Sequence, residues 1–200
     1  MNDKRYNIVF IGRSGCGKGT QAELFKKVLE EKNGPGSVLY VYTGARLREL
    51  ASHSEFFTAR LLNKKSLESG ELTPNSLAIW AYATEFIHGV TDSNHIIIDG
   101  SPRQALEAEA LDEMFYFYDR ENIFHVCLNV SEAWAGARMK ERGRSDDGSE
   151  SIKRRFAYYE REVVPTIEFY KKDTKHKLVE INGEQSIEKV HKDIIKAVGL

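Results

Sequence analysis

The sequence predicts an α/β fold, in which helices cover both faces of a parallel β-sheet. Short apolar runs rich in β-branched and aromatic residues alternate with longer segments of helical pattern. Two of the runs are almost continuously apolar, as strands buried on both faces of a parallel sheet should be. A length of 200 residues with 41% hydrophobic content suits one domain with a substantial core.

Five apolar runs are expected to form the strands of this sheet. In chain order they cover residues 6–12, 37–44, 94–100, 123–130 and 176–183. The intervening stretches are long enough for crossover helices, which connect parallel strands with right-handed geometry. Two stretches are interpreted as insertions that act as flaps: one over about 43–89, polar and helical from Ser52 onward, and a short one over about 142–151.

The composition excludes several classes of partner. With 29 Lys and Arg against 30 Asp and Glu, the net charge of −1 gives no reason to expect a nucleic acid polymer or a membrane as partner. Cys16 and Cys127 lie far apart, and neither they nor the six histidines show a zinc-ligand spacing, so we expect no zinc site. The first apolar run is too short for a signal peptide or a membrane span. We expect a cytoplasmic monomer.

The segment GRSGCGKGT follows the first predicted strand and opens a helix. Its glycines and lysine match the core of a phosphate-binding loop, G-x-x-x-x-G-K. Glycines allow successive backbone N–H groups to turn toward an anion, and the amino end of the helix adds partial positive charge. The segment therefore predicts a site for the phosphates of a nucleotide, ATP, formed by Gly12, Ser14, Gly15, Cys16, Gly17, Lys18, Gly19 and Thr20.

This loop, in the form GxxGxGKGTQ, resembles that of the adenylate kinase group of nucleoside monophosphate kinases. Four later stretches are similar to motifs of the same family and follow in its order: YTGARLREL, SGELTPNSLAIWAY, IIIDGSPRQ and the arginine-rich segment that begins ARMKERGRSDD. The resemblance spans Ile8 to about Gly183. It implies a P-loop NTPase fold of three layers, with reversible phosphoryl transfer from Mg·ATP to AMP to give two ADP.

The resemblance also implies a role for individual residues. Arg138 and Arg142 join the loop at the ATP site. The monophosphate site is formed by Thr43, Gly44, Arg48, Leu72, Thr73, Gly100, Arg103 and Glu107. The catalytic set is Lys18, Asp99, Arg103, Arg144 and Arg155. Mg²⁺ is held through water by Thr20 and Asp99, and the paired acids of a short lid are Asp146 and Asp147.

The chemistry of phosphoryl transfer explains why these residue types are needed. The reaction brings two polyanions together, and the transferred group carries negative charge on its oxygens throughout. Cations must therefore converge on one point. Arginine suits this task, because its planar fork grips two phosphate oxygens and stays charged at any working pH. Asp99, at the end of an apolar strand, can hold hydrated Mg²⁺.

Several positions depart from the family pattern and leave alternatives open. Gly19 stands where the general loop motif has Ser or Thr, Ala45 replaces an acidic residue, and Ser101 replaces an aromatic one. Glu107 falls where the family reads adenine with a glutamine. An ionised carboxylate only accepts hydrogen bonds, which suits the amine of adenine or cytosine or the N–H edge of guanine. CMP and GMP therefore remain open as acceptors beside AMP.

Two other functions are compatible with the same loop. One is a P-loop kinase that acts on a small metabolite, and the other is a nucleotide-binding sensor without catalysis.

The lid has no cysteine or histidine pair, which indicates the short form. A single residue separates Arg142 from Arg144, and this spacing leaves the role of Arg142 undefined.

Overall fold

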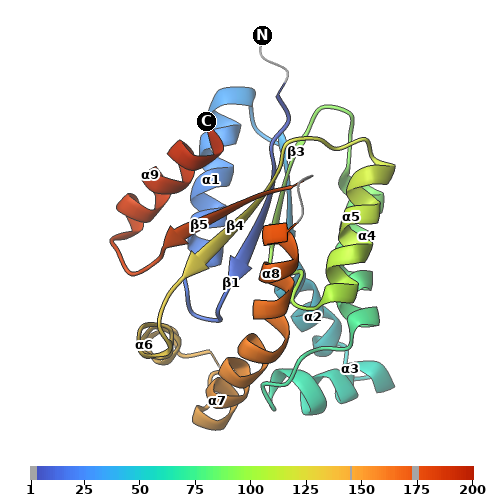
Figure 1. The fold of residues 1–200 in the computed structure, drawn as a ribbon. Helices are drawn as coiled ribbons and strands as arrows, with labels where there is room; N and C mark the ends of the chain where they lie inside the picture. Colours follow the sequence, from blue (N-terminus) through green and yellow to red (C-terminus); the bar gives the residue numbers. More distant parts are fainter. Residues whose placement is uncertain (1–3, 145, 173–175) are drawn as a thin grey trace.

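The computed structural model describes residues 4–144, 146–172 and 176–200, which form a three-layer α/β structure (Figure 1). The central sheet has five parallel strands in the order β2-β3-β1-β4-β5. Their bounds are β1 (Asn7–Gly12), β2 (Val38–Tyr42), β3 (His95–Asp99), β4 (Ile123–Asn129) and β5 (Lys177–Asn182). The predicted fold class is thereby confirmed.

The central strand β1 shows why the sheet is covered on both faces. It pairs in parallel with β3 on one side and with β4 on the other. Ile8 and Phe10 belong to one buried cluster, whereas Val9 and Ile11 belong to a second. Because successive side chains of a strand point to opposite faces, an unbroken apolar run fills two cores at once.

Helices on the two faces complete these cores (Figure 1). α1 (Lys18–Asn33) and α9 (Ile187–Val198) cover one face and contact each other. The other face is covered by α4 (Asn75–Gly89), α5 (Ala105–Phe117) and α8 (Val164–Lys172). The strands are thus held rigidly, which fixes the loops at their carboxyl ends.

The first predicted insertion is smaller than the sequence indicated. β2 ends at Tyr42, and α2 (Thr43–Ser52) begins at the next residue. α2, α3 (Phe57–Leu62) and a π-helical turn (Asn63–Leu67) share a separate small core that includes Leu47 and Leu62. We expected the whole of 43–89 to stand apart from the sheet, but α4 packs on it, because Tyr82 and Phe86 are fully buried in the main core.

The second predicted insertion lies between α6 (Glu132–Arg142) and α7 (Ser149–Tyr158). α7 passes through a π-helical turn (Tyr159–Val163) directly into α8. Pro165 is the second residue of α8, which directly follows this π-helical turn, where the regular hydrogen-bond pattern of the helix is already interrupted. Among the residues described here, no helix is both long and apolar enough to span a membrane.

Candidate active site

A cleft of about 550 Å³ opens at the carboxyl ends of β1, β2 and β3. Seven of the side chains described in its lining carry positive charge and three carry negative charge. The cations are Lys18, Arg48, Arg103, Arg138, Arg142, Arg144 and Arg155, and the anions are Glu23, Asp99 and Glu141. This excess of positive charge occurs in a chain whose net charge is −1, so the cleft suits a strongly anionic ligand.

The glycine-rich loop between β1 and α1 forms the floor of this cleft. Gly15 has a φ of +86°, and a Cβ there would lie 2.5 Å from the carbonyl oxygen of Ala135. Gly17 has a φ of +98° and is the N-cap of α1. The left-handed backbone conformation disfavours any residue except glycine at both positions. At Gly15, the contact with Ala135 excludes a Cβ as well. The loop leaves the amino end of α1 directed at the cleft, as an anion site requires.

Lys18 lies across the inside of the loop. Its Nζ donates hydrogen bonds to the carbonyl oxygens of Gly12 at 2.7 Å and Arg13 at 3.0 Å. Ser14, Gly19 and Thr20 line the cleft beside it. Cys16 is buried, and the cleft lining described here does not include it or Gly12. Gly12 and Cys16 therefore belong to the loop but not to its surface that faces the cleft.

Asp99, the last residue of β3, lies beside Lys18 with only 4% of its surface exposed. Tyr40 donates a hydrogen bond from its hydroxyl to Oδ2 of Asp99 at 3.4 Å. Burial raises the pKa of Asp99, while Lys18, Arg103 and the Tyr40 hydroxyl oppose that rise. Thr20 faces the same cleft, so a carboxylate and a hydroxyl are available as the oxygen ligands that Mg²⁺ prefers.

Gly19 has a structural reason that the sequence did not reveal. A Cβ at this position would lie 3.1 Å from Oδ2 of Asp99. That distance is tighter than an ordinary van der Waals contact. A larger residue after the loop lysine would therefore press on the buried carboxylate where α1 begins, and the hydroxyl comes one residue later, at Thr20.

Two arginines reach the cleft from the β2 and β3 side, and both are held by tyrosine hydroxyls. Arg48 donates a hydrogen bond to the hydroxyl oxygen of Tyr42 at 2.7 Å. Arg103 donates to the hydroxyl oxygen of Tyr158 at 3.0 Å and, through Nε, to the carbonyl oxygen of Gly100 at 2.8 Å. Burial raises the pKa of Tyr158. The positive charge of Arg103, the hydrogen bond with Ser14 and the charges of Arg155 and Lys18 together outweigh burial and lower the pKa.

Two further arginines reach the cleft from the end of α6 and from α7, and carboxylates of the segment that joins these helices hold both. Arg142 donates to both carboxylate oxygens of Asp147, at 2.9 and 2.8 Å. Arg155 donates to Oδ2 of Asp146 at 2.6 Å. Burial raises the pKa of Asp146, but its bonds to Arg155 outweigh burial and lower it. Arg138 and Arg144 line the cleft on the same side, and Arg142 reaches it despite the short spacing.

Comparisons with known proteins agree with this geometry. Residues 10–175 match the family model described as Adenylate kinase. The adenylate kinase of Bacteroides fragilis is 34% identical over 197 residues, which cover 96% of this chain and 97% of that protein. Adenylate kinase 1 of Nostoc sp. is 30% identical over 192 residues, which cover 96% and 98%. The chain belongs to the adenylate kinase family. The family, the fold and the enzyme class, a nucleoside monophosphate kinase, are confirmed.

Four residues that the adenylate kinase pattern assigns to the monophosphate site lie outside the described lining of the cleft: Thr43, Leu72, Thr73 and Glu107. Glu107 is 1% exposed, and its Oε2 accepts a hydrogen bond from the backbone N–H of Arg103 at 3.0 Å. Burial raises its pKa. The first turn of α5 directs the carboxylate toward its own loop rather than into the cleft.

The remaining monophosphate-site residues lie near their expected places. Gly44 and Gly100 line the cleft between the two tyrosine-held arginines. Thr43 is 2% exposed, at the start of α2 beside them. A Cβ on Gly44 would lie 3.4 Å from the guanidinium nitrogens of Arg48, so the backbone passes close to that arginine.

Sequence analysis missed the tyrosines of the adenylate kinase site. Tyr40 and Tyr42 line the cleft, and Tyr158 contacts Arg103 directly beneath it. A signal was present for the first two, because residues two apart at the end of a strand share one face of the sheet. Tyr158 lies in an aromatic helical segment, and no feature of the sequence separates it from its neighbours.

Proposed function

We propose that this chain transfers a phosphoryl group reversibly from Mg·ATP to AMP and releases two ADP. The supporting observation is the convergence of Lys18 and six arginines on one cleft at the carboxyl ends of three strands. Such a density of cations is costly to assemble unless the ligand supplies comparable negative charge. A donor triphosphate beside an acceptor monophosphate supplies it.

The donor phosphates are held by the glycine-rich loop. Backbone N–H groups of the loop and the amino end of α1 bind the phosphate oxygens. Lys18 turns from the carbonyl oxygens of Gly12 and Arg13 toward the phosphates when the nucleotide enters. Arg138 and Arg142 extend the donor site toward the base. Thr20 and Asp99 would hold Mg²⁺ through water, and the bound ion would neutralise charge on the donor phosphates.

The acceptor phosphate is held by Arg48 and Arg103. Their planar forks bind two oxygens each and direct a third toward the donor. Glu107 acts on this site indirectly, because its carboxylate fixes the backbone N–H of Arg103. Tyr40 holds Asp99 by the hydrogen bond to its carboxylate.

The transferring group is stabilised by Arg144 and Arg155 together with Lys18. The acceptor phosphate is already ionised, so no general base is required, and catalysis consists of positioning and electrostatic stabilisation. The segments of about 43–67 and 142–151 are proposed to act as flaps that close over both substrates and exclude water. The monomeric state and the cytoplasmic location stay predictions.

The test is diphosphate formation by the purified chain from Mg·ATP with AMP, CMP, UMP, GMP and dAMP supplied separately. We expect kcat/KM for AMP to exceed that for each other ribonucleotide by at least about tenfold, which requires about 1.4 kcal/mol of selective transition-state binding. A stronger reaction with CMP or GMP would reassign the acceptor while keeping the chemistry. No diphosphate with any acceptor, despite ATP binding, would overturn the proposal in favour of a sensor.

A further inference from the structure

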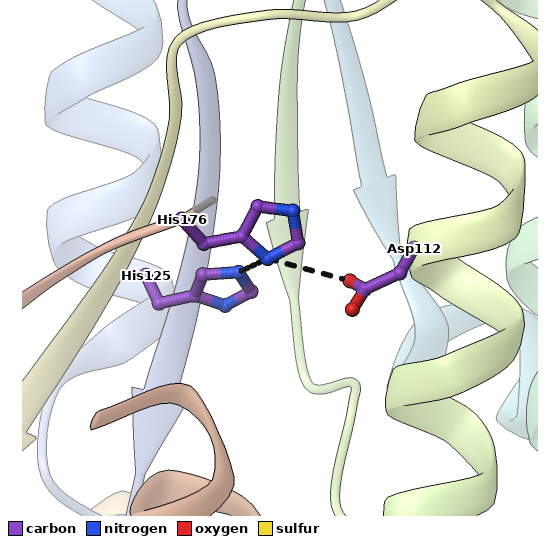
Figure 2. Close-up of side chains that lie close together, drawn as sticks. All are labelled: Asp112, His125 and His176. Carbon is purple, nitrogen blue, oxygen red and sulfur yellow. Dashed lines mark hydrogen bonds and ion pairs between the residues drawn. The ribbon is translucent and has the colours of Figure 1, made fainter. Parts of the chain in front are cut away.

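Asp112, His125 and His176 form a second polar cluster that takes no part in the cleft (Figure 2). They come from three elements: α5, β4 and the residue directly before β5. His125 is the third residue of β4, near the amino end of that strand, whereas the cleft lies at the carboxyl ends. Figure 2 shows the three side chains directed toward one another.

Two of the distances within this cluster are close to those between ligands of one metal ion. Nε2 of His125 and Nδ1 of His176 are 3.2 Å apart, and Nδ1 of His176 is 3.6 Å from Oδ1 of Asp112. Two ligand atoms about 2.05 Å from a tetrahedral ion are about 3.3 Å apart. All three ligand atoms lie within 4.8 Å of one another. Asp112, whose side chain is 23% exposed, has room to close the remaining gap.

The surroundings hold the ligand atoms in position. The ring of Tyr170 stacks on His125 with centroids 3.6 Å apart, and its hydroxyl donates to Oδ1 of Asp112 at 3.4 Å. Outer contacts of this kind orient metal ligands. His125 is fully buried, so the protein fixes the place of its ring.

We propose that Asp112, His125 and His176 bind one divalent transition-metal ion, with Zn²⁺ as the best fit. Two imidazole nitrogens and one carboxylate suit Zn²⁺, whereas Mg²⁺ and Ca²⁺ prefer oxygen ligands alone. A water molecule on the Asp112 side completes four-coordination. The ion ties α5 to β4 and to the start of β5, so it stabilises the core rather than acting in the phosphoryl transfer.

The sequence predicted no zinc site because these ligands are single residues far apart in the chain. His125 lies inside an apolar strand and His176 is 51 residues further on. Zinc motifs that can be recognised from sequence have closely spaced pairs. Only the parallel pairing of β4 with β5, in which His125 lies opposite Leu178, brings the two imidazoles together.

The first experiment measures Zn²⁺ binding to the full chain by competition with a chromophoric chelator, with Mg·ATP present to occupy the cleft. We expect one Zn²⁺ per chain. Asp112→Asn and His176→Gln keep the size of each side chain, and each should weaken binding at least about tenfold, in line with loss of a ligand contact. His88→Ala, at an exposed histidine near the end of α4, is the matched control and should leave binding unchanged.

The second experiment records the visible spectrum of the wild-type chain with Co²⁺, and it does not depend on whether the variants fold. A tetrahedral or five-coordinate Co²⁺ site gives intense visible bands, while Co²⁺ in an octahedral oxygen site gives weak ones. We expect intense bands that Zn²⁺ displaces at one equivalent. Weak bands in the wild type, or equal Zn²⁺ affinity in Asp112→Asn and His176→Gln, would overturn the proposal and leave a hydrogen-bonded cluster.

Discussion

Two groups of arginines approach the cleft from opposite sides, and they are held by different partners. Arg48 and Arg103 bond to the hydroxyls of Tyr42 and Tyr158. Arg142 and Arg155, on the lid side, are paired with the carboxylates of Asp147 and Asp146. A phenol fixes a guanidinium without cancelling its charge, whereas a carboxylate fixes it and neutralises most of its field.

This difference separates two tasks of the site. The tyrosine-held arginines have neutral hydrogen-bond partners, although Asp99 and Glu107 act on Arg103 through space. We propose that these arginines attract and bind the acceptor phosphate directly. Ion pairs with Asp147 and Asp146 hold Arg142 and Arg155 in place. These acids balance the charge of the two arginines until a nucleotide binds. Arginines with neutral hydrogen-bond partners thus lie on the proposed acceptor side, and ion-paired arginines lie beside Asp146 and Asp147.

Removing a tyrosine-held arginine should give the largest effect. We expect Arg103→Ala to lower kcat/KM for AMP at least about 100-fold, the loss typical of one stabilising donor in a preorganised site. ATP affinity, measured by equilibrium titration, should change little, because Arg103 lies on the acceptor side. Arg161→Ala, at an exposed arginine paired with Glu162, is the control and should keep normal turnover. Unchanged turnover in Arg103→Ala would show that the acceptor site lies elsewhere.

Removing a lid carboxylate should have an intermediate effect on the turnover number. Asp146→Asn keeps the shape but loses the charge-assisted bond to Arg155, a bond class worth about 1.5–3 kcal/mol. We expect kcat to fall about tenfold with little change in KM for AMP. The control is Glu150→Gln, at an exposed acid on α7, the helix that also carries Arg155. Both variants are compared by steady-state kinetics. A rise in KM for AMP with kcat unchanged would place Arg155 at the acceptor instead.

Removing a tyrosine hydroxyl should have the smallest effect of the three. Tyr158→Phe leaves Arg103 charged and still bonded to the carbonyl oxygen of Gly100. We expect KM for AMP to rise about fivefold, the equivalent of about 1 kcal/mol for a single hydrogen bond. The control is Tyr116→Phe, at a side chain that is 86% exposed. An effect as large as that of Arg103→Ala would mean that the hydroxyl itself contacts the substrates.

Much of the frame could be predicted from the sequence, because it depends on local patterns. The strand at 6–12 and the glycines after it have few alternatives: an apolar run fills both faces, and Gly15 tolerates no Cβ. The positions of Lys18, Asp99 and Arg103 follow from their places at strand ends. Parallel strands bring those ends to one edge of the sheet.

The remaining features depend on tertiary contacts that no local pattern encodes. Glu107 occupies the position of a base-reading residue, yet in the structure it binds the backbone of its own loop. α4 follows the predicted flap without a break in the helical pattern, and its side chains, among them Tyr82 and Phe86, pack on the main core beside the sheet. Tyr158 contacts Arg103 across 55 residues of sequence. His125 and His176 meet only through the pairing of β4 with β5.

The central claim is that the acceptor-side arginines remain available to phosphate because their hydrogen-bond partners are neutral. It is tested most directly at Tyr42. Tyr42→Glu and Tyr42→Gln place side chains of equal size beside Arg48 that differ only in charge. The measurement is KM for AMP in both variants. We predict that the Glu variant has a KM at least about tenfold above that of the Gln variant, because the carboxylate competes with the phosphate for the guanidinium. Equal KM values would contradict the account.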